Sequence, residues 1–89
     1  MRKYIIAPMK IGLDNVIAVK LSKQYIGKDA EIQKSIEFFR NLFGLDEILI
    51  VILDENEKPF YYGNKEITDD FDNHTYKKFP WTEFEYEEK

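Results

Sequence analysis

Residues 29–53 decide the fold, and they read DAEIQKSIEFFRNLFGLDEILIVIL. In the first fifteen positions, large apolar residues recur at steps of four, three and four, which places them on one face of an α-helix. They are Ile32, Ile36, Phe39 and Phe43, and Phe38 and Leu42 widen the stripe. We therefore predict an amphipathic helix over residues 29–43.

Both ends of this helix carry local signals. Asp29 can cap the start by accepting a hydrogen bond from a first-turn amide, and Glu31 suits the positive end of the helix dipole. Gly44 follows the last apolar position, where glycine adopts a left-handed backbone at little cost. We expect Leu45 to pack back onto the last turn.

The second part of the stretch predicts a buried strand. Residues 48–53 are six consecutive apolar residues rich in β-branching, which is typical of a central strand covered on both faces. Residues 16–21 have a similar composition, so strand, helix and strand together have the length of a crossover between parallel neighbours. A polar turn over 54–59 and an aromatic strand over 60–63 add an antiparallel hairpin.

The flanking segments complete the sheet. We predict a short strand over 3–7 that ends at Pro8, followed by a turn over 8–15. Residues 82–87 alternate between aromatic and acidic side chains, which is the pattern of a strand with one wet face. Because this strand lies at the end of the chain, we expect it at a sheet edge.

Residues 64–80 are predicted to be irregular. Helical turns over 66–71 can be capped by Asn64, and the segment can cover the second face of the 47–53 strand with Phe71, Phe79 and Trp81 as anchors. The predicted fold class is therefore α+β: a small mixed sheet of four to five strands with one main helix on one face. Residues 1–89 form a single small domain.

Composition narrows the classes of function. The chain has 44% hydrophobic and 16% aromatic residues, which is enough for a compact interior, and it has no cysteine for disulfides or thiolate sites. No apolar run reaches the length of a membrane span, so we expect a cytoplasmic protein that does not enter a membrane. The net charge is −4. Residues 1–45 contribute +4 and residues 46–89 contribute −8, and the acidic total disfavours nucleic acid as a partner.

Residue types for catalysis are sparse. The one histidine, His74, follows acidic residues at positions 69, 70 and 72, but the spacing and the missing glycine do not make a calcium loop. The two serines lie in no nucleophile motif, and the four glycines stand singly instead of forming a phosphate loop. We therefore expect no enzyme activity, no metal and no cofactor.

Two short stretches resemble known families. Tyr25-Ile26-Gly27, before the helix, resembles the second half of the motif that names the GIY-YIG nucleases, and Lys34 stands about where that family has its catalytic Arg. The strand before it lacks the family's tyrosine, and the metal-binding Glu has no counterpart, so we predict no nuclease. Residues 52–64 resemble the hairpins of PAS-like sensory domains, and we interpret them as a hairpin only.

The aromatic residues concentrate in the C-terminal part of the chain, and this is the feature that points to a function. Nine of them lie within residues 60–86. We predict that some are exposed and, together with the acidic strand, bind another protein or a second copy of the chain. The predicted partner-binding residues are Tyr61, Tyr62, Trp81, Glu83, Phe84, Glu85, Tyr86 and Glu87.

Three alternatives remain open at this point. The 60–86 aromatics could line a pocket for a small ligand, as in a sensing domain. The acidic half could imitate a nucleic-acid backbone and make the protein an inhibitor. A nuclease or metal enzyme is the third possibility, which the missing residue types disfavour.

Overall fold

The computed structural model describes residues 2–44 and 47–87. In chain order the elements are β1 (Arg2–Ile11), β2 (Asp14–Leu21), α1 (Asp29–Phe43), β3 (Glu47–Leu53), β4 (Pro59–Tyr62), α2 (Lys65–Thr68) and β5 (Thr82–Tyr86). Short 3₁₀ turns lie at Lys23–Tyr25 and Thr75–Lys78. The predicted α+β class is confirmed: one mixed sheet of five strands carries one main helix.

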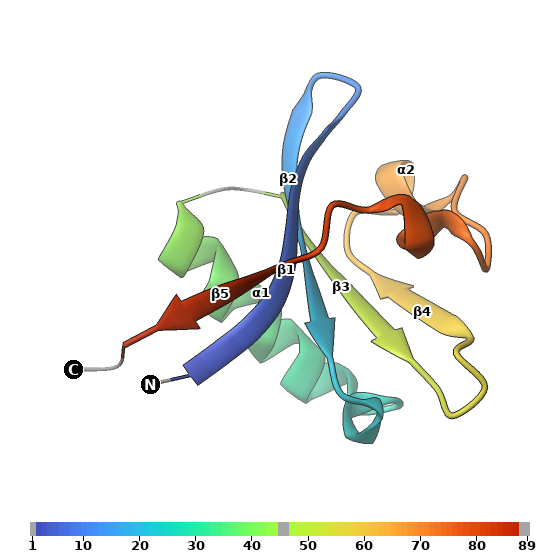
Figure 1. The fold of residues 1–89 in the computed structure, drawn as a ribbon, viewed down its shortest axis with the longest axis horizontal. Coiled ribbons are helices and arrows are strands. Elements are labelled where there is room, and N and C mark those ends of the chain that lie inside the picture. The colour runs from blue at the N-terminus through green and yellow to red at the C-terminus, as the bar shows by residue number, and fades with distance from the viewer. Residues whose placement is uncertain (1, 45–46, 88–89) are drawn as a thin grey trace.

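The strand order across the sheet is β4-β3-β2-β1-β5. β2 and β3 are parallel neighbours joined through α1, as the crossover pattern predicted, and β3 and β4 are antiparallel, as the hairpin pattern predicted. β1 pairs antiparallel with both β2 and β5. β5 pairs with β1 and forms one edge of the sheet, which confirms its expected position. Figure 1 shows α1 on one face of the sheet and the segment with α2 on the other.

The first strand is longer than predicted. β1 does not end at Pro8 but continues to Ile11, and only Gly12 and Leu13 separate it from β2, since Ile11 pairs with Asp14. β5 pairs only with residues 2–6 of β1, so Pro8 lies where one edge of β1 is free. Proline is tolerated in a strand where its missing N–H would meet no partner. The β1–β2 hairpin therefore projects from the body of the domain, as Figure 1 shows.

The helix has the predicted bounds and the predicted inner face. Ile32, Ile36 and Phe39 are buried, and Phe43 is half-buried. Phe38 is 38% exposed, because it lies at the margin of the apolar stripe and not at its centre.

The two helix ends differ from each other in how well they were predicted. Gly44 ends α1 in the left-handed conformation with φ 67° and donates its N–H to the Arg40 carbonyl oxygen at 2.9 Å, as expected. The helix begins at the predicted residue, but the predicted cap was wrong: Lys28 occupies the cap position without a side-chain hydrogen bond, and Asp29 is already the first helical residue. The expected contact of Leu45 lies outside the described residues.

The sheet has a separate apolar cluster on each face. On the α1 face, Ile6, Ile17, Val19 and alternate residues of β3 pack against the helix. On the other face, Ala7, Val16, Ala18, Leu49 and Val51 lie beneath the segment between β4 and β5. β3 is buried on both faces, and this explains why its apolar run is continuous instead of alternating.

The 64–80 segment covers the second face as predicted. Asn64 caps α2, since its Oδ1 accepts a hydrogen bond from the Glu66 N–H at 3.0 Å. Ile67 and Tyr76 are the buried anchors, and the expected anchors Phe71, Phe79 and Trp81 are half-buried around them. None of the helices in the described ranges is long and apolar enough to cross a membrane.

Candidate functional site

The eight residues predicted to bind a partner do not form one surface. Tyr62 and Phe84 pack against the cluster on the α1 face, whereas Tyr61 and Trp81 pack against the cluster on the opposite face. Adjacent residues of a strand point to opposite sides, so Tyr61 and Tyr62 are separated by the sheet. The predicted site therefore divides into three parts with different environments.

The aromatic residues of β5 join the helix. Phe84 lies 5.1 Å from Phe43, measured between ring centroids, and Tyr86 lies 5.8 Å from Phe38. Both pairs are close to the edge-to-face arrangement that aromatic rings prefer. Phe84 and Tyr86 stay half-exposed, so they extend the α1 face as far as the sheet edge.

Tyr61 and Trp81 use their polar atoms within the chain. The Tyr61 hydroxyl donates to the Asp72 carbonyl oxygen at 2.9 Å and accepts from the Tyr76 N–H at 3.1 Å. The Trp81 Nε1–H donates to the Tyr76 carbonyl oxygen at 2.9 Å. Partial burial raises the pKa of Tyr61, because ionisation would place a charge there. These two residues hold the 64–81 segment against the sheet.

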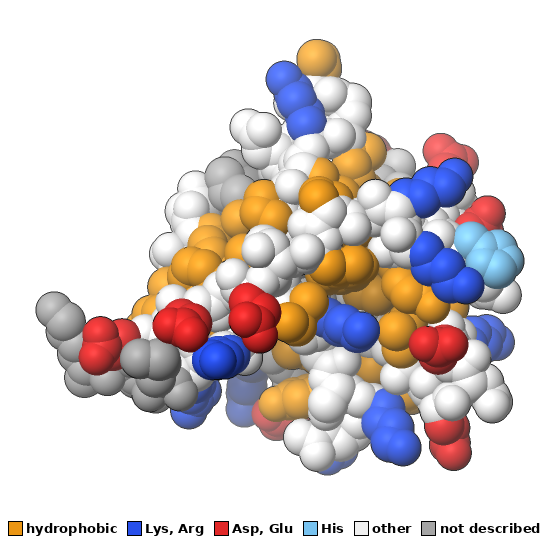
Figure 2. All heavy atoms as spheres, in the orientation of Figure 1, with side chains coloured by type: hydrophobic (Ala, Val, Ile, Leu, Met, Phe, Trp, Pro, Cys, Tyr) orange, Lys and Arg blue, Asp and Glu red, His pale blue; other side chains and the backbone are white. Residues whose placement is uncertain are grey.

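The glutamates of β5 line the face opposite α1. Glu83 and Glu85 of β5 and Glu87 directly after it are exposed, and the carboxylate of Glu85 lies 3.7 Å from the Lys3 ammonium on the neighbouring strand. Figure 2 shows acidic and basic side chains lying next to each other at this corner. The basic and acidic halves of the sequence therefore meet across the β1–β5 pair. The net charge of −8 carried by residues 46–89 does not form one separate acidic surface.

The two edges of the sheet differ in protection. β4 has only four residues and begins with Pro59, and short strands and prolines are common ways to block an edge. β5 has five residues and no proline, and no further strand of the described chain pairs with its outer edge. Its main chain therefore offers unpaired N–H and carbonyl groups to an added strand.

A hollow of about 370 Å³ lies beside this edge on the α1 face. Its lining residues are Phe38, Asn41, Leu42 and Tyr86. Phe38 is one of the two large hydrophobic side chains that stand out as exposed in the described chain. The β5 edge thus combines an apolar hollow on one face with a row of carboxylates on the other.

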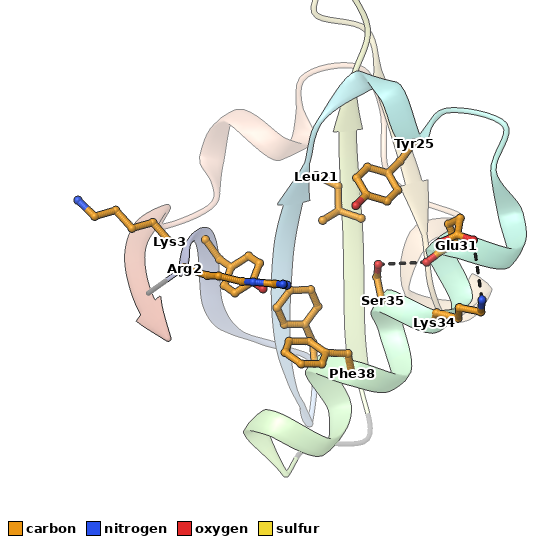
Figure 3. Close-up of a pocket in the computed structure, with 10 residues that line it drawn as sticks. Arg2, Lys3, Leu21, Tyr25, Glu31, Lys34, Ser35 and Phe38 are labelled. Carbon is orange, nitrogen blue, oxygen red and sulfur yellow. Dashed lines mark hydrogen bonds and ion pairs between the residues drawn. The ribbon is translucent and has the colours of Figure 1, made fainter. Parts of the chain in front are cut away.

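A second hollow, of about 440 Å³, lies between the starts of β1 and α1 and the end of β2. Arg2, Tyr25, Ser35 and Phe38 line it and come from β1, the 3₁₀ turn Lys23–Tyr25 and α1 (Figure 3). Tyr25 belongs to the motif before the helix and Phe38 to the apolar stripe of the helix, but the two residues were not predicted to lie together. No local pattern could have done so, because the residues are far apart in sequence.

The acidic segment with His74 serves a turn. The Asp72 carboxylate accepts hydrogen bonds from the His74 N–H at 2.8 Å and from the Thr75 hydroxyl at 3.1 Å. The first of these bonds, followed by the second, lowers the pKa of Asp72, because both favour its charged form. Among the described residues, no three His, Asp or Glu side chains are grouped so that they could hold a metal ion.

Comparison with known proteins gives no matching family model, no matching curated protein and no matching solved structure. The function therefore has to be inferred from the geometry of this chain.

Proposed function

We propose that this protein is a non-enzymatic binding module that takes up an extended segment of another protein along the outer edge of β5. The observation that carries the proposal is that this unpaired edge has an apolar hollow on one face and a row of carboxylates on the other. An added strand would form main-chain hydrogen bonds with β5, which is a common mode of peptide recognition. Its alternate side chains would then fall on the two faces of the extended sheet.

The surroundings of β5 define the partner's chemistry. On the α1 face, the added side chains would enter the hollow beside Phe38, Leu42 and Tyr86 and should be apolar. On the opposite face they would lie beside Glu83 and Glu85 and should be basic, since opposite charges across a strand pair are favourable. The proposed partner is therefore a strand in which apolar and basic residues alternate.

Self-association through β5 fits less well. A two-fold symmetric antiparallel pair keeps both helices on the same side of the joined sheet. A pair centred on Phe84 then sets Glu83 of one copy opposite Glu85 of the other, and like charges in this position are destabilising. The basic start of β1 cannot act as the added strand either, because residues 2–6 already pair with β5 and residues 5–11 with β2. A foreign partner is the better match.

Two further observations bear on the alternative functions, a nucleic-acid mimic and a small-ligand binding domain. Lys3 stands between the carboxylates of β5 and the rest of the sheet, and a nucleic-acid mimic needs a denser acidic face. Of the C-terminal aromatics, Tyr61, Trp81 and Tyr76 are engaged in hydrogen bonds within the chain, so they do not form a free pocket wall. Both observations favour strand addition.

Two designed peptides test the proposal. Each has eight residues with valine at alternate positions, and the remaining positions are all lysine in one and all glutamate in the other. The lysine peptide should bind and the glutamate peptide should not, and raising the salt concentration should weaken binding. Hydrogen exchange should slow at the amides of β5 when the lysine peptide is added.

Matched charge reversals give the control. Replacing Glu83, Glu85 and Glu87 by lysine should abolish lysine-peptide binding and create binding of the glutamate peptide. Replacing Glu66, Asp69 and Asp70 by lysine changes the net charge equally, from −4 to +2, and should leave the preference intact. Equal loss in both variants would show a nonspecific charge effect. A dimer mass that disappears only in the first variant would show self-association, and either result refutes the proposal.

A further inference from the structure

We propose that a hollow between α1 and the β3–β4 pair binds a small zwitterion, a free α-amino acid with a short side chain, through one positive and one negative side chain of the protein. The hollow has a volume of about 300 Å³, at the lower end of the range of about 300–1,000 Å³ typical of small-molecule sites. It lies on the β4 side of the sheet, whereas β5 forms the opposite edge. The site therefore does not depend on the proposed peptide partner.

The two walls of the hollow come from different elements. Gln33, Ile36 and Arg40 follow one another at steps of three and four, so they lie on the same side of α1. Glu47 and Ile48, at the start of β3, line the hollow from the sheet. Ile36 and Ile48 are buried in the apolar cluster on the α1 face and form the floor. The helix thus contributes a guanidinium and the sheet contributes a carboxylate.

The carboxylate is held in place by the chain that follows β4. The Asn64 Nδ2 donates a hydrogen bond to the Glu47 Oε1 at 3.2 Å, and the Asn64 Oδ1 accepts one from the Glu66 N–H at 3.0 Å. A Cβ at Gly63 would lie 3.1 Å from the Ile48 carbonyl oxygen, so glycine lets the chain pass close to β3 immediately before Asn64. One oxygen of the Glu47 carboxylate is therefore fixed, and the other can accept from a ligand.

The guanidinium of Arg40 is available to a ligand. Within residues 2–44 and 47–87, no hydrogen bond or ion pair engages it, although Glu47 lines the same hollow. A guanidinium binds both oxygens of a carboxylate through its planar donors, and a carboxylate accepts hydrogen bonds from an ammonium group. Two opposite charges that line one hollow without pairing with each other match a ligand that carries both charges.

The same pair of charges disfavours ligands with a single charge. A simple anion would interact favourably with Arg40 and unfavourably with Glu47, and a simple cation would do the reverse. A zwitterion satisfies both groups. The isoleucine floor and the small volume leave room for a short apolar side chain, and alanine is the matching probe.

The test is a titration of the full chain, labelled with ¹⁵N, with L-alanine, propionate and ethylamine. Propionate is alanine without its ammonium group, and ethylamine is alanine without its carboxylate. L-Alanine at millimolar concentration should cause saturable shifts of the amide signals of Arg40, Glu47 and Asn64. Each analogue should bind at least about tenfold more weakly, as expected when hydrogen bonds to one charged group are lost.

Two variants with matched controls locate the site. Arg40→Gln and Glu47→Gln should each weaken alanine binding at least about tenfold, and the glutamine at 47 keeps an oxygen that can accept from Asn64. Lys10→Gln and Glu55→Gln remove the same charges from exposed residues outside this hollow and should leave binding unchanged. The proposal is overturned if alanine causes no saturable shift in the parent, if propionate or ethylamine binds as tightly as alanine, or if either site variant has no larger effect than its control.

Discussion

Replacing Phe39 by alanine tests the packing of α1 on the sheet. Phe39 is 2% exposed, and its ring contacts those of Tyr4, Phe38 and Phe43 at centroid distances of 4.9, 5.1 and 6.1 Å. Removing a buried phenyl ring costs about 3–5 kcal/mol, since apolar burial is lost and a cavity remains. Domains of this size have a total free energy of unfolding of roughly 5–15 kcal/mol, so the loss is a large fraction of the whole.

The adjacent residue gives the matched control. Phe38→Ala removes the same atoms one position along the helix, but Phe38 is 38% exposed and contacts its neighbours mainly at the margin of the cluster. Its loss should cost roughly 1–2 kcal/mol, mostly from aromatic pairing. The comparison therefore reports which face of α1 is buried.

Thermal unfolding followed by circular dichroism measures both variants. For a domain of this length, each kcal/mol shifts Tm by roughly 4–8 °C, so Phe39→Ala should lower Tm by at least about 12 °C. Phe38→Ala should lower it by roughly 4–16 °C on the same scale. If Phe39→Ala melts within a few degrees of the parent, or if Phe38→Ala is the more damaging change, the helix faces the sheet differently from the structure and the reasoning fails.

Three further predictions concern single residues. Gly44→Ala should reduce stability by about 1 kcal/mol in urea titrations, because φ at this position is 67°, and Gly44→Asn should lose less. Asp72→Ala should lower Tm at neutral pH, and the difference from the parent should shrink as the pH falls below about 4. The folded-state pKa of Asp72 is depressed, so its contribution is present above the unfolded pKa and is lost as the pH falls through the folded pKa. Tyr61→Phe should reduce stability by about 1–3 kcal/mol by leaving the Tyr76 N–H without its acceptor. The pKa of Tyr61 is raised in the folded state, so the pH dependence is opposite to that of Asp72. The contribution of the Tyr61 hydroxyl to stability is complete below the unfolded-state pKa of about 10 and is lost as the pH rises through the folded-state pKa. The Tm of Tyr61→Phe should therefore fall less steeply than that of the parent in alkali.

The elements whose signals are local could be predicted from the amino-acid sequence alone. The spacing of Ile32, Ile36 and Phe39 specified the buried face of α1, and Gly44 specified where it ends, because both depend on residues within a few positions of each other. The continuous apolar run of β3 likewise predicted a strand buried on both faces. The alternation in β5 predicted a strand with one solvent-exposed face. Two local predictions were wrong for reasons outside the local sequence. Pro8 predicts the end of a strand, but it lies inside β1 where that strand has a free edge. Asp29 predicts a helix cap, but it is already the first residue of α1.

Which surfaces these elements form depends on their arrangement in the folded chain. Tyr61 and Tyr62 are neighbours in sequence, but the pleat of β4 places them on opposite faces of the sheet, so the predicted aromatic surface separates into unrelated parts. Arg2, Tyr25 and Phe38 are distant in sequence, and they line one hollow because β1, β2 and α1 converge at one corner of the fold. The acidic half of the chain meets the basic half for the same reason, since β5 returns to pair with β1. Sequence periodicity indicates which face of each element points to the core. The composition of a surface depends instead on which distant elements pair, and this pairing is set only when the whole sheet assembles.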